Sequence, residues 1–388
     1  MAGALGEDVH LSPWVTSVIF GGGIVGAAFL LSWAADVAEL DIPSGLALAI
    51  VALVAVLPEY AVDFYLTWEA GQDPLGPYIH FATANMTGGN RLLIGIGWPL
   101  VALLYWSRQR QGLTLDRPIH LEMVAIMVAT LLAFAIPAFN EIALWATGAL
   151  FVVFGVYMWL QSKEETEEHE LVGPAVLIGT LGTKVRRVVT AGLITYAALV
   201  IVVAAEPFAN GLIDSGKALG LEEFLLIQWI APLASEAPEL LIATLLVLRG
   251  NAAGALVLLI SAKVNQWTLL IGSLPVVYSI SLGQLSGLPL DSRQSWEIWL
   301  TAAQSLFAVV LLLRGRLSPK SGLALLVLFS TQLIFVQPVI RHIYTFIYLG
   351  LTAAVLVKDP GRLGQLSRMA SAVGKSVSGR AVREAHTD

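Results

Sequence analysis

The sequence predicts an all-α, polytopic membrane protein with ten or eleven transmembrane helices in two inverted repeats. Three observations support this prediction. The first two concern the whole chain: 57% of its 388 residues are hydrophobic and only 13% are charged, whereas an ordinary soluble domain has about 25% charged residues. The third is a pair of similar segments that contain proline and glutamate, one in each half. A composition this apolar excludes a single soluble domain.

The expected transmembrane helices are long apolar stretches separated by charged residues. About 20 apolar residues cross a hydrocarbon core roughly 30 Å thick as a helix. Eleven candidate spans follow in order at residues 14–34, 44–68, 77–106, 119–137, 141–160, 188–208, 221–249, 253–283, 295–313, 321–337 and 341–357. The third is longer than a bilayer requires, so we expect it to be tilted or broken at Gly88 and Gly89, unless these glycines only permit close helix packing.

The basic residues predict the orientation in the membrane. With the N-terminus outside, the loops and the tail predicted inside together contain most of the Lys and Arg residues, such as Arg108, Lys184 and Arg187. The loops predicted outside are acidic or nearly neutral, as at residues 206–214. Because basic loops stay in the cytoplasm, we expect a multi-pass protein of the plasma (inner) membrane with the N-terminus outside and the C-terminus cytoplasmic.

A charged linker divides the chain into two halves. We expect a first transmembrane half at residues 1–160, a cytoplasmic linker at 161–187 and a second half at 188–357. The linker contains the acidic run 163–170, which we interpret as a solvated helix or, alternatively, as a calcium-sensing segment. Residues 358–388 form a basic cytoplasmic tail, expected to be mobile or to lie on anionic lipid headgroups.

An internal repeat relates the two halves. The tetrapeptide LPEY at 57–60 recurs as APEL at 237–240, and Asn85 and Asn265 have the same separation in sequence. Five spans, an odd number, separate the two copies, so they cross the bilayer in opposite directions. Inverted repeats of this kind place a substrate site near the midplane, between the halves.

Acidic residues inside the spans identify a candidate site. Glu59, Glu236 and Glu239 lie near mid-bilayer, and Asp63 shares a helix face with Glu59. An ionised carboxylate at this depth costs roughly 2.5 to 3.5 kcal/mol, so the cluster requires cations, protons or basic side chains as partners. The one basic residue that we place at comparable depth is Lys263.

The groups around these acids indicate a divalent cation. Pro58 and Pro238 each remove a helical hydrogen bond, which frees the carbonyl groups of Val54 and Ala234. Two glutamates, these two carbonyls and two asparagine amides approach the six to eight oxygens, at about 2.3 to 2.6 Å, that Ca²⁺ requires. Once the ion leaves, facing carboxylates repel each other, so obligatory exchange for monovalent cations or protons follows.

At these residues the sequence resembles the calcium/cation antiporter superfamily, which includes the membrane region of sodium/calcium exchangers and the cation/proton exchangers. The family repeat has Gly-Thr-Ser-x-Pro-Glu on one helix and Gly-Asn-x-x-Gly-Ser-Asn on the next. Its counterparts here are VAVLPE at 54–59 with ANMTGGN at 84–90, and ASEAPE at 234–239 with SAKVN at 261–265. The resemblance implies two inverted halves with Glu59 and Glu239 as the central metal ligands.

The chain departs from the family at its sodium-binding positions. Family members bind sodium through hydroxyl groups of the first motif, whereas this chain has Ala55 and Val56 there, and Glu236 replaces a Ser in the second half. We expect antiport of Ca²⁺ or a similar cation for Na⁺. The alternative is a Ca²⁺(cation)/H⁺ exchanger with protonatable carboxylates, in which Lys263 replaces the sodium sites or only neutralises a carboxylate.

The expected cation-binding residues come from both repeats, and Lys263 is expected to modulate them. They are Glu59, Asp63, Asn85, Ser235, Glu236, Glu239 and Asn265. The asparagines have an alternative role as hydrogen-bonding groups between helices. No cofactor is expected, and the transported ions are Ca²⁺ with Na⁺ or H⁺.

Other classes of function fit the sequence less well. The chain contains no cysteine, which excludes disulfides and thiolate metal sites. An intramembrane hydrolase is disfavoured because neither an HExxH nor a G-x-S-x-G motif is present. A channel and a non-transporting scaffold are further alternatives. The expected partners are inorganic cations and the lipid bilayer, not nucleic acid, and the sequence leaves the oligomeric state open.

Overall fold

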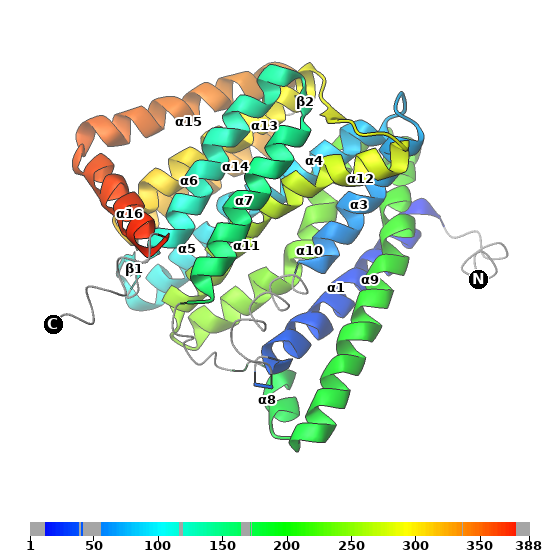
Figure 1. The fold of residues 1–388 in the computed structure, drawn as a ribbon, viewed down its shortest axis with the longest axis horizontal. Helices are drawn as coiled ribbons and strands as arrows, with labels where there is room; N and C mark the ends of the chain where they lie inside the picture. The colour runs from blue at the N-terminus through cyan, green and yellow to red at the C-terminus, as the bar shows by residue number, and fades with distance from the viewer. Residues whose placement is uncertain are drawn as a thin grey trace.

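The protein is a bundle of long helices (Figure 1). The computed structural model describes residues 12–38, 40–41, 56–115, 119–163, 171, 173–335 and 337–377. Within these residues, eight helical segments are long and apolar enough to cross a membrane. The prediction of an all-α polytopic membrane protein is therefore confirmed.

The described helices of the two halves follow one another in chain order. The first half contains α1 (Pro13–Ala38), α3 (Leu57–Gln72), α4 (Tyr78–Leu92), η2 (Leu93–Gly97), α5 (Trp98–Gln109), α6 (His120–Ala135), η3 (Ile136–Phe139) and α7 (Leu144–Gln161). The second contains α8 (Pro174–Gly179), α9 (Thr183–Leu219), α10 (Glu223–Leu248), α11 (Ala252–Asn265), η4 (Gln266–Leu270), α12 (Ile271–Leu282), α13 (Ser292–Leu312), α14 (Pro319–Ile334), α15 (Pro338–Lys358) and α16 (Gly361–Val377). η2 and η4 are π-helical turns, so α4–η2–α5 and α11–η4–α12 are two continuous rods.

The third predicted span is irregular beyond the two glycines where we expected a break. α4 is regular through Gly88 and Gly89, and the π-helical turn η2 follows it. The predicted break at these glycines is wrong, and the alternative of close helix packing holds. A Cβ atom on Gly88 would overlap the backbone carbonyl oxygen of Gln228 in α10. The missing side chain thus lets α4 and α10 touch.

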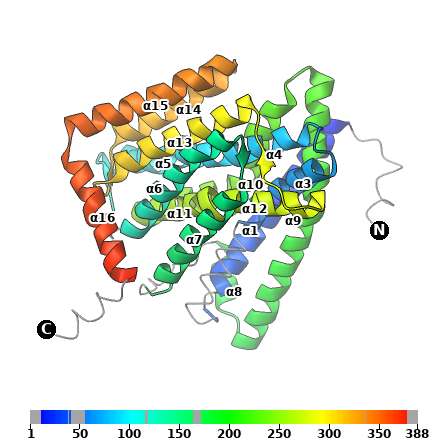
Figure 2. The ribbon, with the colours of Figure 1, turned by 45° about the horizontal axis from the view of Figure 1, so that its top comes forward.

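Helices α1 and α9 lie side by side along one flank of the bundle (Figures 1 and 2). The sequence predicted a span at 188–208 followed by an outside loop at 206–214. This prediction is wrong, because α9 runs without interruption to Leu219 and includes Pro207. Its 37 residues correspond to about 55 Å at 1.5 Å per residue. α9 therefore exceeds the thickness of the bilayer core.

Two short antiparallel strand pairs connect loops of the two halves. β1 (Leu113–Thr114) pairs with β4 (Arg316–Leu317), and β2 (Glu141–Ile142) pairs with β3 (Leu288–Pro289). In the chain, α6 lies between β1 and β2, and α13 lies between β3 and β4. The corresponding helices α6 and α13, which pack together, are therefore tied to each other at both ends.

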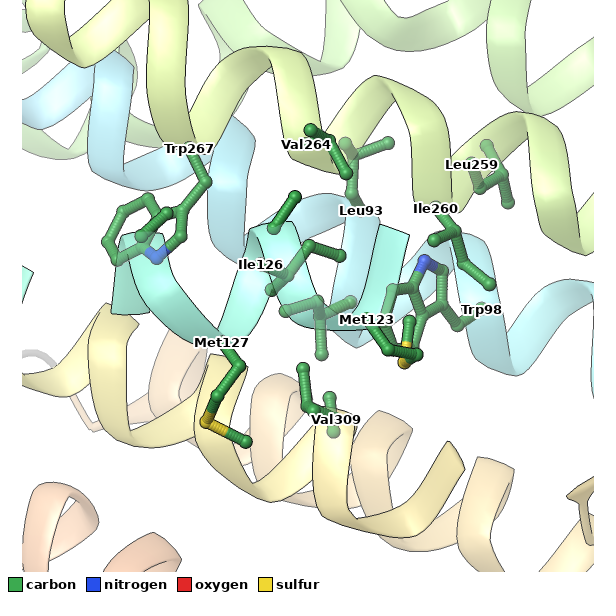
Figure 3. Packing of buried hydrophobic residues seen from close by; sticks show 14 of the residues in the cluster. Leu93, Trp98, Met123, Ile126, Met127, Leu259, Ile260, Val264, Trp267 and Val309 are labelled. Atoms are coloured by element: carbon green, nitrogen blue, oxygen red, sulfur yellow. The ribbon is translucent and has the colours of Figure 1, made fainter. Parts of the chain in front are cut away.

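A large apolar core lies between the two rods and these tied helices. Figure 3 shows side chains from η2, α5, α6, α11, η4 and α13 that interdigitate, among them Leu93, Trp98, Met123, Ile126, Met127, Leu259, Ile260, Val264, Trp267 and Val309. The indole nitrogen of Trp267 donates to the Thr130 hydroxyl at 3.1 Å. This packing holds the rods in register with each other.

The predicted tail is structured over much of its length. α16 leaves the end of α15 at a sharp angle (Figure 2) and buries Met369. Arg362 donates to the carbonyl oxygens of Val310 and Leu311 at the end of α13, at 2.6 and 3.0 Å. The expectation of a mobile tail is wrong for residues 361–377. Residues 378–388, and the acidic run after Lys163, lie outside the described part of the chain.

An ion pair joins the end of α1 to the start of α9. Arg186 donates two hydrogen bonds to the Asp41 carboxylate, at 2.7 and 2.8 Å. These bonds hold the pKa of Asp41 below its usual range, with the charges of Arg186 and Arg187 adding to the effect.

The lowered pKa predicts acid-sensitive stability. A carboxylate whose pKa is lower in the folded protein stabilises it above the unfolded pKa, about 3.9, and loses this contribution as the pH falls through the folded value. We therefore expect Asp41→Asn to lower the thermal unfolding midpoint at pH 6, and the difference from the unchanged protein to shrink at pH 3. Scanning fluorimetry in detergent at both pH values measures it. A difference of equal size at pH 3 contradicts the prediction.

Candidate cation site

Three buried carboxylates meet between α3 and α10. One oxygen of each of Glu59, Glu236 and Glu239 lies within 4.8 Å of the other two. The three residues are 5%, 0% and 8% exposed, respectively. The structure therefore brings together the acids of the two repeats, and the residues that align with one another in sequence, Glu59 and Glu239, face a shared space.

The prolines place these acids differently in the two halves. Pro58 lies at the start of α3, where its missing N–H costs no helical hydrogen bond, so Glu59 occupies the first turn. Val54, whose carbonyl group Pro58 was expected to free, lies outside the described residues. Pro238 is inside α10 and leaves the carbonyl of Ala234 without its helical donor, as expected. The positive N-terminal end of the α3 dipole also stabilises the negative charge of the Glu59 carboxylate.

Asp63 and Asn85 extend the site along α3 and α4. The Asn85 Nδ2 donates to Asp63 Oδ1 at 2.9 Å. Both residues line a small cavity together with Glu59, Glu236 and Gly89. The first-half acid and amide predicted from the sequence therefore lie in one place.

In the second half, Gln266 contacts the acids; the sequence favoured its neighbour Asn265 as the counterpart of Asn85 and left Gln266 as the other choice. Its Nε2 donates to Glu236, and its side chain also interacts with Glu59. Asn265, which was predicted, lies next to Gln266 and accepts a hydrogen bond from the hydroxyl of Tyr60, the residue after Glu59, at 2.8 Å. One residue turns a helical side chain by about 100°, and η4 begins at Gln266. The signal in the sequence was a second polar amide next to the aligned one.

Several buried oxygens at the site have no hydrogen-bond partner among the described residues. They are Glu59 Oε2, Glu236 Oε2, Glu239 Oε2, Asn85 Oδ1 and Gln266 Oε1. Buried polar atoms are nearly always paired, and burying a charge without a partner is costly. A group of acceptors that lacks donors fits a bound cation or protons.

Ser235 and Lys263 take different positions relative to the acids. Ser235 lines the cavity, and its hydroxyl donates to the backbone of its own helix, which leaves the oxygen able to act as a ligand. The Lys263 ammonium group donates to Asn90, at 2.8 Å to Oδ1 and 3.3 Å to O, and lies 4.1 Å from the centre of the Trp267 ring. Its hydrogen bonds thus go to an amide rather than to Glu236.

A second basic residue besides Lys263 lies buried within the predicted spans. Arg91, inside the third predicted span, is also buried, and it forms an ion pair with Glu297 of α13 at 2.6 Å. The expectation of a single deep basic residue is therefore wrong, and the partner of Arg91, Glu297, lies far away in the sequence, in the ninth predicted span. The acids of the candidate site are separate from this pair.

Gln266 gives a test of the cavity. Hydrogen bonds to charged groups contribute about 1.5 to 3 kcal/mol, so we expect Gln266→Leu to weaken Ca²⁺ binding by roughly 10- to 100-fold. Isothermal titration calorimetry in detergent measures the affinity. Unchanged affinity in Gln266→Leu contradicts this role.

Comparisons with known proteins agree with the fold and the two-part motif. A family model described as sodium/calcium exchanger protein matches residues 11–163 and 189–337. Among solved structures, the H⁺/Ca²⁺ exchanger CAX is 43% identical, with a TM-score of 0.91 over 96% of this chain and 94% of that chain. The sodium-calcium exchanger NCX_Mj is 15% identical, with a TM-score of 0.56 over 83% of this chain and 98% of that chain, and is similar in fold. No match was found among curated proteins.

Proposed function

We propose, because this chain belongs to the sodium/calcium exchanger protein family, that it exchanges Ca²⁺ for protons across a membrane. The family consists of cation antiporters, not of enzymes, and the chain is accordingly a cation exchanger. The identity of the cations is our proposal. It rests above all on the three carboxylates within 4.8 Å of one another, whose free oxygens have no donors among the described residues.

The geometry suits a divalent cation. Glu59 and Glu239 come from oppositely threaded helices and together neutralise two positive charges. Ca²⁺ prefers six to eight oxygen ligands at about 2.3 to 2.6 Å, and the cavity offers more oxygens than these two carboxylates. We propose that the further ligands are Glu236, Asp63, Asn85 and Gln266.

Protons are the counter-ion that the cluster accepts most readily. When Ca²⁺ leaves, carboxylates less than 5 Å apart repel strongly in a medium of low dielectric. A proton bound to one carboxylate removes a charge and donates a hydrogen bond to its neighbour. The relative with 43% identity is named an H⁺/Ca²⁺ exchanger, and Val56, at a hydroxyl position of the family motif, is apolar and buried.

Sodium is the second candidate for the counter-ion. The observation that favours it is Ser235, whose hydroxyl lines the cavity beside Glu236. Sodium binding through hydroxyl groups is what the family resemblance implies. If Na⁺ is the counter-ion, Glu59 and Glu239 already balance the charge of Ca²⁺, and the exchange does not require the carboxylate of Glu236.

Transport in proteoliposomes distinguishes the two candidates. Calcium uptake is followed with ⁴⁵Ca²⁺ under a pH gradient without Na⁺ and, separately, under a Na⁺ gradient at equal pH, with K⁺ and valinomycin fixing the membrane potential. We expect uptake with the pH gradient and none above background with Na⁺ alone. Uptake driven by the Na⁺ gradient alone would identify Na⁺, and not H⁺, as the counter-ion. Uptake that needs neither gradient indicates a channel and contradicts exchange.

A further inference from the structure

A second cluster of buried charges lies between α4, α10, α13, α14 and α15. Glu297 forms ion pairs with Arg91, at 2.6 Å, and with Arg341. The three residues are at most 7% exposed. They line a small cavity with Gln228, Trp229 and Gln332. None of these side chains belongs to the candidate cation site.

The cluster has a surplus of positive charge. Each oxygen of Glu297 is used by a different guanidinium group, so two positive charges share one negative charge. The neighbouring Arg293 is already paired with Glu222. A buried charge without a counter-charge is strongly unfavourable. One unit of positive charge in this cavity therefore lacks a compensating group among the described residues.

Apart from Arg91 Nη2 and Glu297 Oε2, which face each other in the 2.6 Å ion pair, the polar atoms of the cavity without a hydrogen-bond partner among the described residues are donors. Arg341 Nη1 and Gln228 Nε2 are buried and have no partner among the residues that the structure describes. The one acceptor of Gln332, Oε1, is occupied by Arg91 Nη1 at 3.4 Å. Arg91 also lies over the Trp229 ring, 4.8 Å from its centre. Convergent donors with surplus positive charge are what an anion requires, and guanidinium groups match oxyanions especially well.

We infer that this cavity binds a singly charged anionic group, supplied by a free anion such as chloride or by the phosphodiester of a lipid headgroup. One negative charge balances the surplus, and the unpaired donors of Arg341 and Gln228 supply its hydrogen bonds. A lipid headgroup has access because Gln228, Glu297 and Arg341 lie within the first two turns of α10, α13 and α15, near one end of these spans.

Thermal unfolding of delipidated protein in a neutral detergent tests the inference without any transport measurement. The probes are chloride against gluconate at constant Na⁺, inorganic phosphate, and dihexanoyl phosphatidylglycerol. A ligand that binds only the folded state raises the unfolding midpoint in a saturable way, and we expect a rise of several degrees with at least one probe. The probe that acts at the lowest concentration identifies the source of the anion.

Three variants make the result specific. Arg341→Gln leaves Arg91 and Glu297 as a neutral pair, so it should fold and lose the anion-dependent rise. Gln228→Leu removes the other unpaired donor and should raise the half-saturating concentration about tenfold. Arg314→Gln, which removes an arginine paired with Asp359 outside the cavity, should behave like the unchanged protein. The inference is overturned if no probe gives a saturable rise, or if the rise persists in both Arg341→Gln and Gln228→Leu.

Discussion

Replacing Glu59 or Glu239 by glutamine is expected to reduce calcium exchange at least about 100-fold. Each substitution removes one of the two negative charges, one from each repeat, that we propose neutralise the divalent ion. Breaking a buried charge pair costs about 3 to 5 kcal/mol, and each 1.4 kcal/mol corresponds to a factor of ten in affinity. Uptake of ⁴⁵Ca²⁺ into proteoliposomes, normalised to reconstituted protein, measures the loss.

The same substitution elsewhere on each helix is the control. Glu69→Gln in α3 and Glu223→Gln in α10 change residues outside the carboxylate cluster, and both should retain uptake. Glu59→Gln and Glu239→Gln should also unfold at temperatures no lower than the unchanged protein, because they relieve repulsion between buried carboxylates. Substantial uptake in both site variants would remove the basis for the proposed function.

Gly88→Ala is expected to cause the second large effect, on folding rather than on ion binding. The added methyl group would overlap the carbonyl oxygen of Gln228, which belongs to the α10 backbone and has no rotamer to change. Overpacking of a core costs about 1 to 3 kcal/mol, and an immovable neighbour places this substitution at the upper end. We expect a fall of at least several degrees in the unfolding midpoint and a lower yield of monodisperse protein.

The adjacent glycine provides a close control for this experiment. A Cβ atom on Gly89 would meet its nearest neighbours, Glu236 and Pro232, at 3.6 Å, an ordinary van der Waals distance. Gly89→Ala should therefore unfold at nearly the same temperature as the unchanged protein. Equal midpoints for the two alanine variants contradict the contact between α4 and α10.

Much of the fold was predictable because a charge inside an apolar span is costly and therefore conspicuous. Glu59 and Glu239 stood out by depth, and the repeat around them indicated that two oppositely threaded copies face each other. The family match supports the fold that this argument predicted. The ligand roles of these acids stay a prediction.

The parts that sequence analysis missed depend on backbone geometry or on distant partners. The contact of Gln266 with the acids depends on where a π-helical turn begins, and no simple pattern of residues marks that point. Arg91 and Glu297 neutralise each other only after α4 and α13 pack. The acidic residues at 206–214 suggested a loop, yet α9 continues through them and includes Pro207, because its packing against α1 outweighs the local cost of one missing hydrogen bond.

The two strand pairs also constrain the order of events during biosynthesis. Leu113 pairs with Leu317, and Ile142 pairs with Leu288, so each connection joins a loop made early to one made much later. Contacts this distant in sequence form slowly and late. α6 is synthesised well before α13, so its contacts with α13 form only after α13 has been inserted into the membrane. A chain whose synthesis stops between β3 and β4 therefore retains only one of its two ties.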